Sequence, residues 1–426
     1  MKKINSILNN VLEKIKLTKE DSTRIEKSLG NFLEQIKKRI NELKIDVEIF
    51  VGGSFAKKTV IKKDIYDIDI FLRFNKKYKE EISKITEKII KNIGGFTIIH
   101  GSRDYFKIQI FSDFFIELIP VLKVKNPKQA ENITDLSYAH VSYIKRRVKN
   151  PKLLDDIMLA KAFCYANHCY GAESYINGFS GYALELLIYY YKGFMKFIKA
   201  ISKIDIKKKL VIDIEKLYKN KSTILIDINS AKLESPIILI DPTYKQRNAL
   251  AALSDETLEK FKKSCKDFLS EPSEEAFELK KTDLEQIKKD AKSSKSEFIL
   301  LEAHTNKQEG DIAGSKLLKF YKHFSEEIQN FFLIKDKGFN YNKKNAARFF
   351  FVVKNKGEIL ISGPCLKDEK NAKKFKKKHQ TYFTKKNKLY SKNKIEDNIN
   401  KFIDNWILKN KKKLKEMCVE KLEIIE

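Results

Sequence analysis

The sequence is poor in glycine and proline, the residues that dominate fibrous and low-complexity chains. Its 426 residues include 15 glycines and 7 prolines, which argues against a collagen-like or low-complexity architecture. No internal period of roughly 20–50 residues is evident, so a repeat array is not indicated either. Hydrophobic residues make up 42% and aromatic residues 11% of the chain. This composition is enough for packed cores and excludes a wholly disordered chain.

Cysteine is also scarce, and the few cysteines are not arranged for bonding. They are odd in number, dispersed and without a CxxC pair: Cys164, Cys169, Cys265, Cys365 and Cys418. This pattern fits neither a disulfide framework nor a zinc site. It is typical of a reducing compartment, and we therefore expect a cytoplasmic protein.

Long apolar runs are missing. Charged residues interrupt every apolar run within residues 1–20, so no signal-peptide core is predicted. The most apolar helical stretch, Phe179–Tyr191, is interrupted by Glu185 and is too short to span a bilayer. We therefore expect no membrane-spanning segment.

Acidic residues are outnumbered by basic ones. The chain has 86 Lys and Arg against 57 Asp and Glu, a formal net charge of +29. Such a charge indicates a polyanionic partner, either nucleic acid or an anionic membrane surface. No amphipathic anchor stands out, which favours nucleic acid. The alternative is a lysine-rich compositional bias that only keeps the protein soluble.

Periodicity in the first part of the chain predicts an α/β domain. Apolar residues at helical spacing predict helices over residues 2–44. From residue 47 the pattern changes to strands, most clearly at residues 66–74, where apolar and polar residues alternate. A helix over residues 78–92 follows. Three further strand candidates come after it, namely FTIIHG, YFKIQIF and FFIELIPVLKVK.

The remainder of the chain is first helical and then mixed. Because single cores stop growing near ~250–300 residues, a chain of 426 residues predicts more than one domain. Residues 138–208 predict helices, one ending at Gly171 and another with Ser180 as its N-cap. Polar residues 265–295 mark a boundary. Beyond them, EFILLEA and ARFFFVVKNKGEILISGP predict strands around a helix, and Lys367–Lys394 is dense in lysine.

The motif with the clearest chemistry combines a Gly-Gly-Ser turn with three carboxylates. Residues 52–54 end a predicted strand, Asp67 and Asp69 are spaced to share one face of the next, and Glu117 lies on a later strand. Carboxylates placed together repel each other unless a cation lies between them. Oxygen ligands beside substrate phosphates suit Mg²⁺, and a third carboxylate would complete the site of a two-metal transfer. The N–H groups and hydroxyl of the turn could approach a triphosphate. The alternative is a polar strand face exposed to water.

In this order, the turn, the DxD pair and the later carboxylate resemble the nucleotidyltransferase superfamily of the DNA polymerase β type. Further segments resemble archaeal-type (class I) CCA-adding enzymes, especially YGAE and GFSGYALELL within Asn150–Ile188. ELIPVLKV (Glu117–Val124) is similar to the family's third-carboxylate strand, and IDPTYKQRNALAALS (Ile240–Ser254) to its DP…RN segment. GPCLKDEKNAKKF (Gly363–Phe375) is similar to its late GP…F motif. The matches follow the family's order along almost the whole chain.

The resemblance implies an enzyme that adds C, C and A to the 3′ end of tRNA without a template. CTP and ATP would be its substrates, and two Mg²⁺ ions its cofactors. It would bind tRNA through the acceptor stem and 3′ end, and whether it forms a homodimer is open. The implied fold is α+β and multidomain. It has a nucleotidyltransferase head with a small mixed sheet and helices (1–137), a mainly helical neck for base recognition (138–270), and an α/β body with a basic tail element that binds tRNA (271–426).

The resemblance also implies roles for individual residues, carried over by motif. The metal ligands and catalytic carboxylates would be Asp67, Asp69 and Glu117. The nucleotide-binding residues would be Gly53, Ser54, Lys57, His140, Lys161, Tyr170 and Arg247, the last as the base-reading arginine of DP…RN. The family usually has Arg where Lys57 stands, and Lys lacks the planar fork of Arg. It usually has Asp where Glu117 stands, so the longer Glu arm must retract to reach the same metal position.

Without the resemblance these residues have simpler interpretations. Lys57 and Arg247 would be solvated charges, His140 a polar residue at a helix start, and Lys161 and Tyr170 parts of an amphipathic helix segment.

Rival functions stay open as well. Another template-independent RNA nucleotidyltransferase, forming poly(A) or oligoadenylate, would share the turn and the carboxylates but not the DP…RN and GFSGY segments. A noncatalytic RNA-binding relative would release no pyrophosphate, although all three carboxylates are present here. A membrane-surface protein is the least supported alternative.

Overall fold

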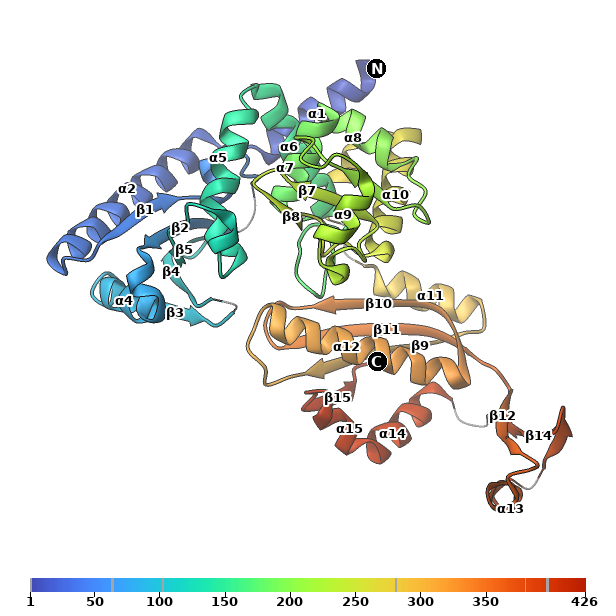
Figure 1. The fold of residues 1–426 in the computed structure, drawn as a ribbon. Coiled ribbons are helices and arrows are strands. Elements are labelled where there is room, and N and C mark those ends of the chain that lie inside the picture. The colour runs from blue at the N-terminus through green and yellow to red at the C-terminus, as the bar shows by residue number, and fades with distance from the viewer. Residues whose placement is uncertain (1, 63–64, 102, 280–281, 380, 396–397) are drawn as a thin grey trace. The chain divides into compact units, whose positions relative to one another are not determined.

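The chain divides into two compact units, Met1–Lys280 (unit 1) and Lys281–Glu426 (unit 2). Figure 1 shows the computed structural model, which describes residues 2–62, 65–101, 103–279, 282–379, 381–395 and 398–426. Among these residues, no helix combines the length and the apolar character needed to cross a membrane. Each unit has its own sheets and its own buried core.

Unit 1 begins with two helices and a five-stranded mixed sheet, as the sequence predicts. The helices are α1 (Lys2–Ile15) and α2 (Lys19–Glu42), and Thr18 caps α2 by accepting a hydrogen bond from the Asp21 N–H. The strands lie in the order β1 (Val47–Val51), β2 (Tyr66–Phe74), β5 (Phe114–Leu122), β4 (Tyr105–Phe111) and β3 (Phe96–Ile99). Strands β2 and β5 pair in parallel, whereas the other pairs are antiparallel.

Alternation along β2 explains how this sheet presents its polar side chains. Ile68, Ile70 and Leu72 are buried in one cluster with apolar residues of α2 and α4 (Ile82–Ile90). Successive side chains of a strand point to opposite faces. Asp67 and Asp69 therefore lie on the face directed away from these helices.

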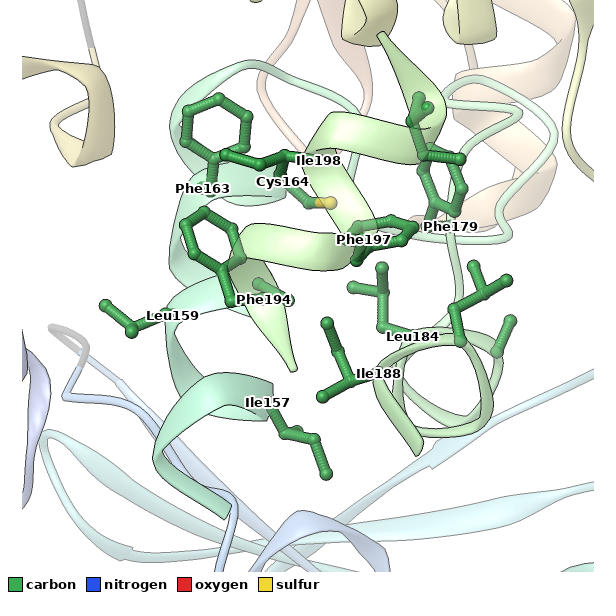
Figure 2. Close-up of a cluster of buried hydrophobic side chains, with 14 of the residues drawn as sticks. Ile157, Leu159, Phe163, Cys164, Phe179, Leu184, Ile188, Phe194, Phe197 and Ile198 are labelled. Carbon is green, nitrogen blue, oxygen red and sulfur yellow. The ribbon is translucent and has the colours of Figure 1, made fainter. Parts of the chain in front are cut away.

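The second half of unit 1 is built from helices around an aromatic core. The helices are α5 (Ser137–Arg147), α6 (Pro151–Ala166), α7 (Gly181–Tyr191), α8 (Phe194–Ile201), α9 (Lys221–Asp227) and α10 (Asp255–Ser270). Figure 2 shows where α6, α7 and α8 meet through buried side chains that include Phe163, Phe194 and Phe197. A small sheet in the order β6 (Leu210–Ile212), β7 (Ile237–Asp241) and β8 (Tyr244–Asn248) completes the unit.

Local signals place the ends of these helices, with one correction. Ser180 caps α7 as predicted, accepting a hydrogen bond from the Ala183 N–H at 3.2 Å. The prediction that the preceding helix ends at Gly171 is wrong. Helix α6 ends at Ala166, and His168 (φ 54°) adopts the left-handed conformation that closes it.

Unit 2 contains a four-stranded antiparallel sheet with helices on both faces. The strand order is β10 (Phe332–Tyr341), β11 (Ala346–Asn355), β9 (Glu297–His304) and β15 (Lys421–Ile424). Phe349 of β11 contacts Phe320 of α12 (Asp311–Phe331), which also meets Trp406 of α14 (Ile399–Lys409). The next residue, Phe350, points to the opposite face and packs with α11 (Leu284–Ser293). A short helix, α15 (Lys411–Glu416), precedes β15.

The lysine-dense segment of unit 2 is folded. Strand β12 (Glu358–Cys365) pairs with β14 (Lys388–Lys394), which also pairs with β13 (Phe383–Lys385), and α13 (Glu369–Lys378) packs on β12. A Cβ atom at Gly363 would lie 2.8 Å from the ring of Phe375. The two residues that frame the GP…F segment therefore touch, and the contact requires glycine.

The predicted α+β multidomain fold is confirmed, and most predicted elements are present. The helix predicted over residues 78–92 is shorter, since a 3₁₀ helix (Lys76–Glu81) precedes α4. Strands β10 and β15 were not predicted. Unit 1 contains both the predicted head (1–137) and the predicted neck (138–270). The boundary between them, and the start of the body at residue 271, stay predictions.

Candidate active site

Three carboxylates meet on the face of the five-stranded sheet that points away from α2 and α4. In the parallel pairing of β2 with β5, Asp69 lies directly opposite Glu117, and Asp67 is two residues before Asp69 on the same face. Asp67 is exposed, whereas Asp69 and Glu117 are partly buried. The structure thus brings together the three residues that the sequence predicts as metal ligands.

The electrostatics of this cluster fit a divalent cation. Burial, together with the nearby charges of Asp69 and Asp67, raises the pKa of Glu117 to about 7, while Lys107 opposes the shift. The same surroundings raise the pKa of Tyr105 on β4 to about 12, burial again having the largest effect. Burial is the largest cause of the raised pKa of Glu117, and repulsion from Asp69 and Asp67 adds to it. A cation coordinated by the three carboxylates would relieve that repulsion.

The Gly-Gly-Ser turn lies against these carboxylates. Strand β1 ends before Gly52, whose N–H donates to the carbonyl oxygen of Asp69 at 2.9 Å. Gly53 has φ +61°, and a Cβ atom there would lie 1.8 Å from an Asp69 carboxylate oxygen. Only glycine therefore allows this approach. Ser54 follows in the short helix α3 (Gly53–Ala56).

Two lysines predicted to bind nucleotide converge on a buried carboxylate that was not predicted as part of the site. Glu185 of α7 is fully buried and accepts hydrogen bonds from Lys57 Nζ at 2.7 Å and Lys161 Nζ at 2.9 Å. Burial alone would raise the pKa of the Glu185 carboxyl, but Lys161 and Lys57 outweigh it and lower the pKa. Thr59 donates to the same carboxylate at 3.2 Å. The lysines are therefore built into the interior, not placed as solvated charges.

Two of these residues, Thr59 and Lys161, border a small cavity within unit 1. Its lining includes Ser54, Thr59, Asp67, Lys161 and Tyr170. Four of these five residues were predicted as ligands of nucleotide or metal, and they come from segments far apart in the sequence. Tyr170 is largely buried, which raises the pKa of its hydroxyl.

The remaining predicted residues, His140 and Arg247, meet at a second buried carboxylate, Asp241. Asp241 Oδ2 contacts His140 Nε2 at 3.1 Å and accepts from Arg247 at 2.7 Å. Asp241 Oδ1 accepts from the Tyr182 hydroxyl at 3.0 Å, and the Tyr182 ring stacks on His140 with ring centroids 4.1 Å apart. Burial opposes ionisation of Asp241, yet His140, Arg247 and the Thr243 N–H bring its pKa well below the usual range. Burial lowers the pKa of His140, against the opposing effect of Asp241.

Sequence reasoning missed the residues that hold the predicted ones in place. They are Thr59, Tyr182, Glu185 and Asp241. Glu185 gave a signal as a single charge inside an apolar helix, and Asp241 as the Asp of the DP…RN segment. The sequence offers no comparable signal for Thr59.

Two family models match segments of unit 1. The model for "tRNA nucleotidyltransferase, second domain" matches residues 155–278, and that for "Nucleotidyltransferase domain" matches residues 33–109. Among solved structures, a cytoplasmic RNA terminal U-transferase aligns with a TM-score of 0.50 and 14% identity, over 66% of this chain and 100% of that chain. The RNA terminal uridylyl transferase Cid1 gives a TM-score of 0.51 and 12% identity, over 66% of this chain and 99% of that one. At such low identity these likenesses show the fold.

Curated relatives are more similar in sequence. The CCA-adding enzyme of Nanoarchaeum equitans is 41% identical over 238 residues, which are 55% of this chain and 58% of that protein. The CCA-adding enzyme of Methanocaldococcus jannaschii is 28% identical over 91% of this chain and 87% of that protein. The matched region thus spans less than two thirds of the first relative and most of the second. Over most of its length the chain is thus similar to archaeal CCA-adding enzymes, and two segments of unit 1 match nucleotidyltransferase family models.

Proposed function

We propose that this chain adds C, C and A to the 3′ end of tRNA, using CTP and ATP without a template and releasing pyrophosphate. The observation that carries the proposal is the presence, within unit 1, of the carboxylate cluster around Asp69 and of an arginine fixed on Asp241. The first suits nucleotidyl transfer, and the second suits selection of a base. The names of the relatives point to the same activity.

In the proposed reaction the 3′-hydroxyl of the RNA attacks the α-phosphorus of the nucleotide, and pyrophosphate leaves. Asp67, Asp69 and Glu117 would hold two Mg²⁺ ions, which supply charge neutralisation and lower the pKa of the attacking hydroxyl. Ser54 and Lys161 border the cavity beside Asp67, which supports a role for them in binding the triphosphate.

Base choice follows from the hydrogen-bonding edges of the four bases. Cytosine and adenine each present an exocyclic amino donor beside an unprotonated ring nitrogen, whereas uracil and guanine present a carbonyl beside an N–H. Arg247 only donates, so it matches the ring nitrogen of the first pair and opposes the N–H of the second. Asp241 fixes the guanidinium, and a fixed donor that is left unpaired penalises the wrong base.

Unit 2 would contribute much of the affinity for tRNA. Lys376, Lys377 and Lys378 end α13 and are exposed. Two nearby aromatic rings, Tyr382 and Phe383, are exposed and available for base stacking. Lys376 Nζ lies 5.4 Å from the centroid of the Tyr382 ring. Double-stranded RNA is recognised mostly through its phosphates, shape and 2′-hydroxyls.

The decisive experiment is incubation of the protein with tRNA lacking its 3′ CCA and each labelled nucleotide in turn. The proposal expects CTP to be incorporated first and ATP only after CTP, with three nucleotides added in total. A product extended by many adenylates would indicate a poly(A)-forming enzyme instead. A protein that binds tRNA but releases no pyrophosphate would be a noncatalytic relative.

A further inference from the structure

Glu185 is a charged residue in an apolar interior. Its neighbours on α7, which include Leu184, Leu186 and Leu187, are fully buried, and so is Glu185 itself. A buried carboxylate is costly unless charged and hydrogen-bonded partners compensate it. If the position only filled space, an apolar residue would serve better, so its partners indicate what Glu185 contributes.

Those partners come from both halves of unit 1. One carboxylate oxygen of Glu185 accepts from Lys57 at 2.7 Å, and the other accepts from Lys161 at 2.9 Å and Thr59 at 3.2 Å. Lys161 also donates to the Thr59 hydroxyl at 2.7 Å and to the Thr59 carbonyl at 3.3 Å. Lys57 and Thr59 follow the Gly-Gly-Ser turn, whereas Lys161 and Glu185 belong to the helical half. The carboxylate therefore links the segment after the turn to α6 and α7.

The cluster borders the cavity that Ser54 and Asp67 also line, through Thr59 and Lys161. Helix α7 approaches the same place, since a Cβ atom at Gly181 would lie 2.9 Å from the Tyr170 hydroxyl and 3.8 Å from Lys161 Cε. Two ammonium groups share one carboxylate, so the cluster as a whole is cationic. A cationic cluster beside a carboxylate site suits a polyphosphate, one end of which can face the cation site and the other the lysines.

We propose that Glu185 is a positioning residue for nucleotide binding, which holds the ammonium groups of Lys57 and Lys161 in place beside the cavity. The inference rests on the proposed function, in which this cavity receives the triphosphate. Without the carboxylate, two buried ammonium groups would face each other with less compensation. They would move apart, and that change would weaken a triphosphate site.

The test compares the full-length wild-type protein with Glu185→Gln, which keeps the side-chain shape and removes the charge. Glu215→Gln is the matched control, because Glu215 also accepts from two partners, Tyr143 at 2.5 Å and Arg147 at 2.7 Å. Binding of inorganic triphosphate and of CTP is measured calorimetrically without tRNA, and tRNA binding by fluorescence anisotropy. Thermal unfolding is recorded for each variant.

In Glu185→Gln, we expect affinity for triphosphate and CTP to fall about tenfold or more, equivalent to about 1.4 kcal/mol. The KM for CTP should rise with a smaller change in kcat, and tRNA affinity should stay within about twofold of wild type. Glu215→Gln should bind both anions normally. A folded Glu185→Gln protein with wild-type triphosphate affinity would overturn the proposal and leave Glu185 with a purely structural role.

A second variant covers the case in which Glu185→Gln does not fold. Thr59→Val removes one hydroxyl that touches both Glu185 and Lys161, and it should weaken triphosphate binding several-fold. If it binds triphosphate as the wild type does, the proposal fails. Failure of the proposed function would look different, because the wild type would bind CTP yet not extend tRNA, while the comparison of triphosphate affinities would still report on Glu185.

Discussion

Units 1 and 2 use charge in opposite ways. Unit 1 buries charged side chains and pairs each one, as at Glu185, Lys161 and Asp241. Among the described residues of unit 2, no Asp, Glu, Lys or Arg is buried. Its lysines instead lie at the surface, as in the run at the end of α13. Fixed, buried charge suits chemistry that depends on ångström-scale placement, whereas exposed charge suits attraction to a polyanion.

The matches to family models follow the same division. Both matching family models lie within unit 1. A site made of paired, buried groups constrains many residues at once, because each must reach a partner. A surface that binds phosphates through charge is satisfied by many arrangements of lysine. We therefore expect substitutions in unit 1 to affect rate and selectivity, and substitutions in unit 2 to affect tRNA affinity.

The largest effect should come from Asp69→Ala. Loss of one of three cation ligands should reduce nucleotide addition by on the order of 10³-fold or more, while tRNA affinity persists. Asp113→Asn, in the turn before β5 where Asp113 pairs with Arg24, is the control and should stay within a few-fold of wild type. Initial rates of labelled CTP incorporation measure both, and near-normal turnover by Asp69→Ala would refute the metal assignment.

Adding a methyl group at the Gly-Gly-Ser turn should reduce the rate of nucleotide addition almost as much. In Gly53→Ala the new Cβ would collide with the Asp69 carboxylate, and displacement of a catalytic group by about 1 Å can reduce the rate ~10²-fold. Gly30→Ala is the control, because Gly30 lies in α2 with nothing within 4 Å of the added Cβ. It should leave the rate unchanged and stabilise the helix by ~0.5–1 kcal/mol. Equal rates for the two variants would contradict the observed contact.

Arg247→Ala should change selectivity more than affinity. Removal of a charged donor from the base edge should lower the preference for CTP and ATP over UTP and GTP by about tenfold or more. Arg146→Ala removes an exposed arginine of the same unit and should leave the preference intact. The measurement is kcat/KM for each of the four nucleotides in the wild type and in both variants. If the preference is unchanged in Arg247→Ala, Arg247 serves only as a structural partner of Asp241.

Reversing charge in unit 2 should have the smallest effect on the rate of nucleotide addition. Replacing Lys376, Lys377 and Lys378 with Glu should weaken tRNA binding and flatten its salt dependence, by roughly 0.7–0.9 in slope for each phosphate that is no longer neutralised. The control replaces the three exposed lysines at 411–413, at the start of α15, with Glu. It changes the net charge by the same amount at another place in unit 2. Anisotropy titrations at several salt concentrations compare them, and identical losses of affinity would mean that net charge alone matters.

How far the site could be predicted depends on the kind of contact. Alternation along residues 66–74 and the DxD spacing were enough to place Asp67 and Asp69 on one face, because strand geometry is local. The pairing of Asp69 with Glu117 is a parallel register set by the whole sheet, and spacing along the chain does not encode it. The convergence of Lys57, from one half of the unit, with Glu185, from the other, likewise requires tertiary packing.

The same limit appears in the fold. Strand β15 at the C-terminal end forms only because β9 offers an edge beside it, and four residues give little periodic signal. His168 rather than Gly171 closes α6, although glycine has the stronger intrinsic preference for positive φ. Regular alternation is readable from sequence, whereas edges and helix ends depend on neighbours.

The most direct test of the contrast between the two units measures kcat and tRNA affinity together in two full-length variants, Asp69→Ala and the triple Glu variant of residues 376–378. We expect Asp69→Ala to keep its tRNA affinity and to lose kcat even at saturating tRNA. We expect the triple variant to lose affinity and to recover a near-normal kcat once tRNA saturates. Two results would contradict the assignment of chemistry to unit 1 and of tRNA binding to unit 2. One is that saturating tRNA restores the kcat of Asp69→Ala. The other is that the triple variant keeps its tRNA affinity and still has a low kcat at saturating tRNA.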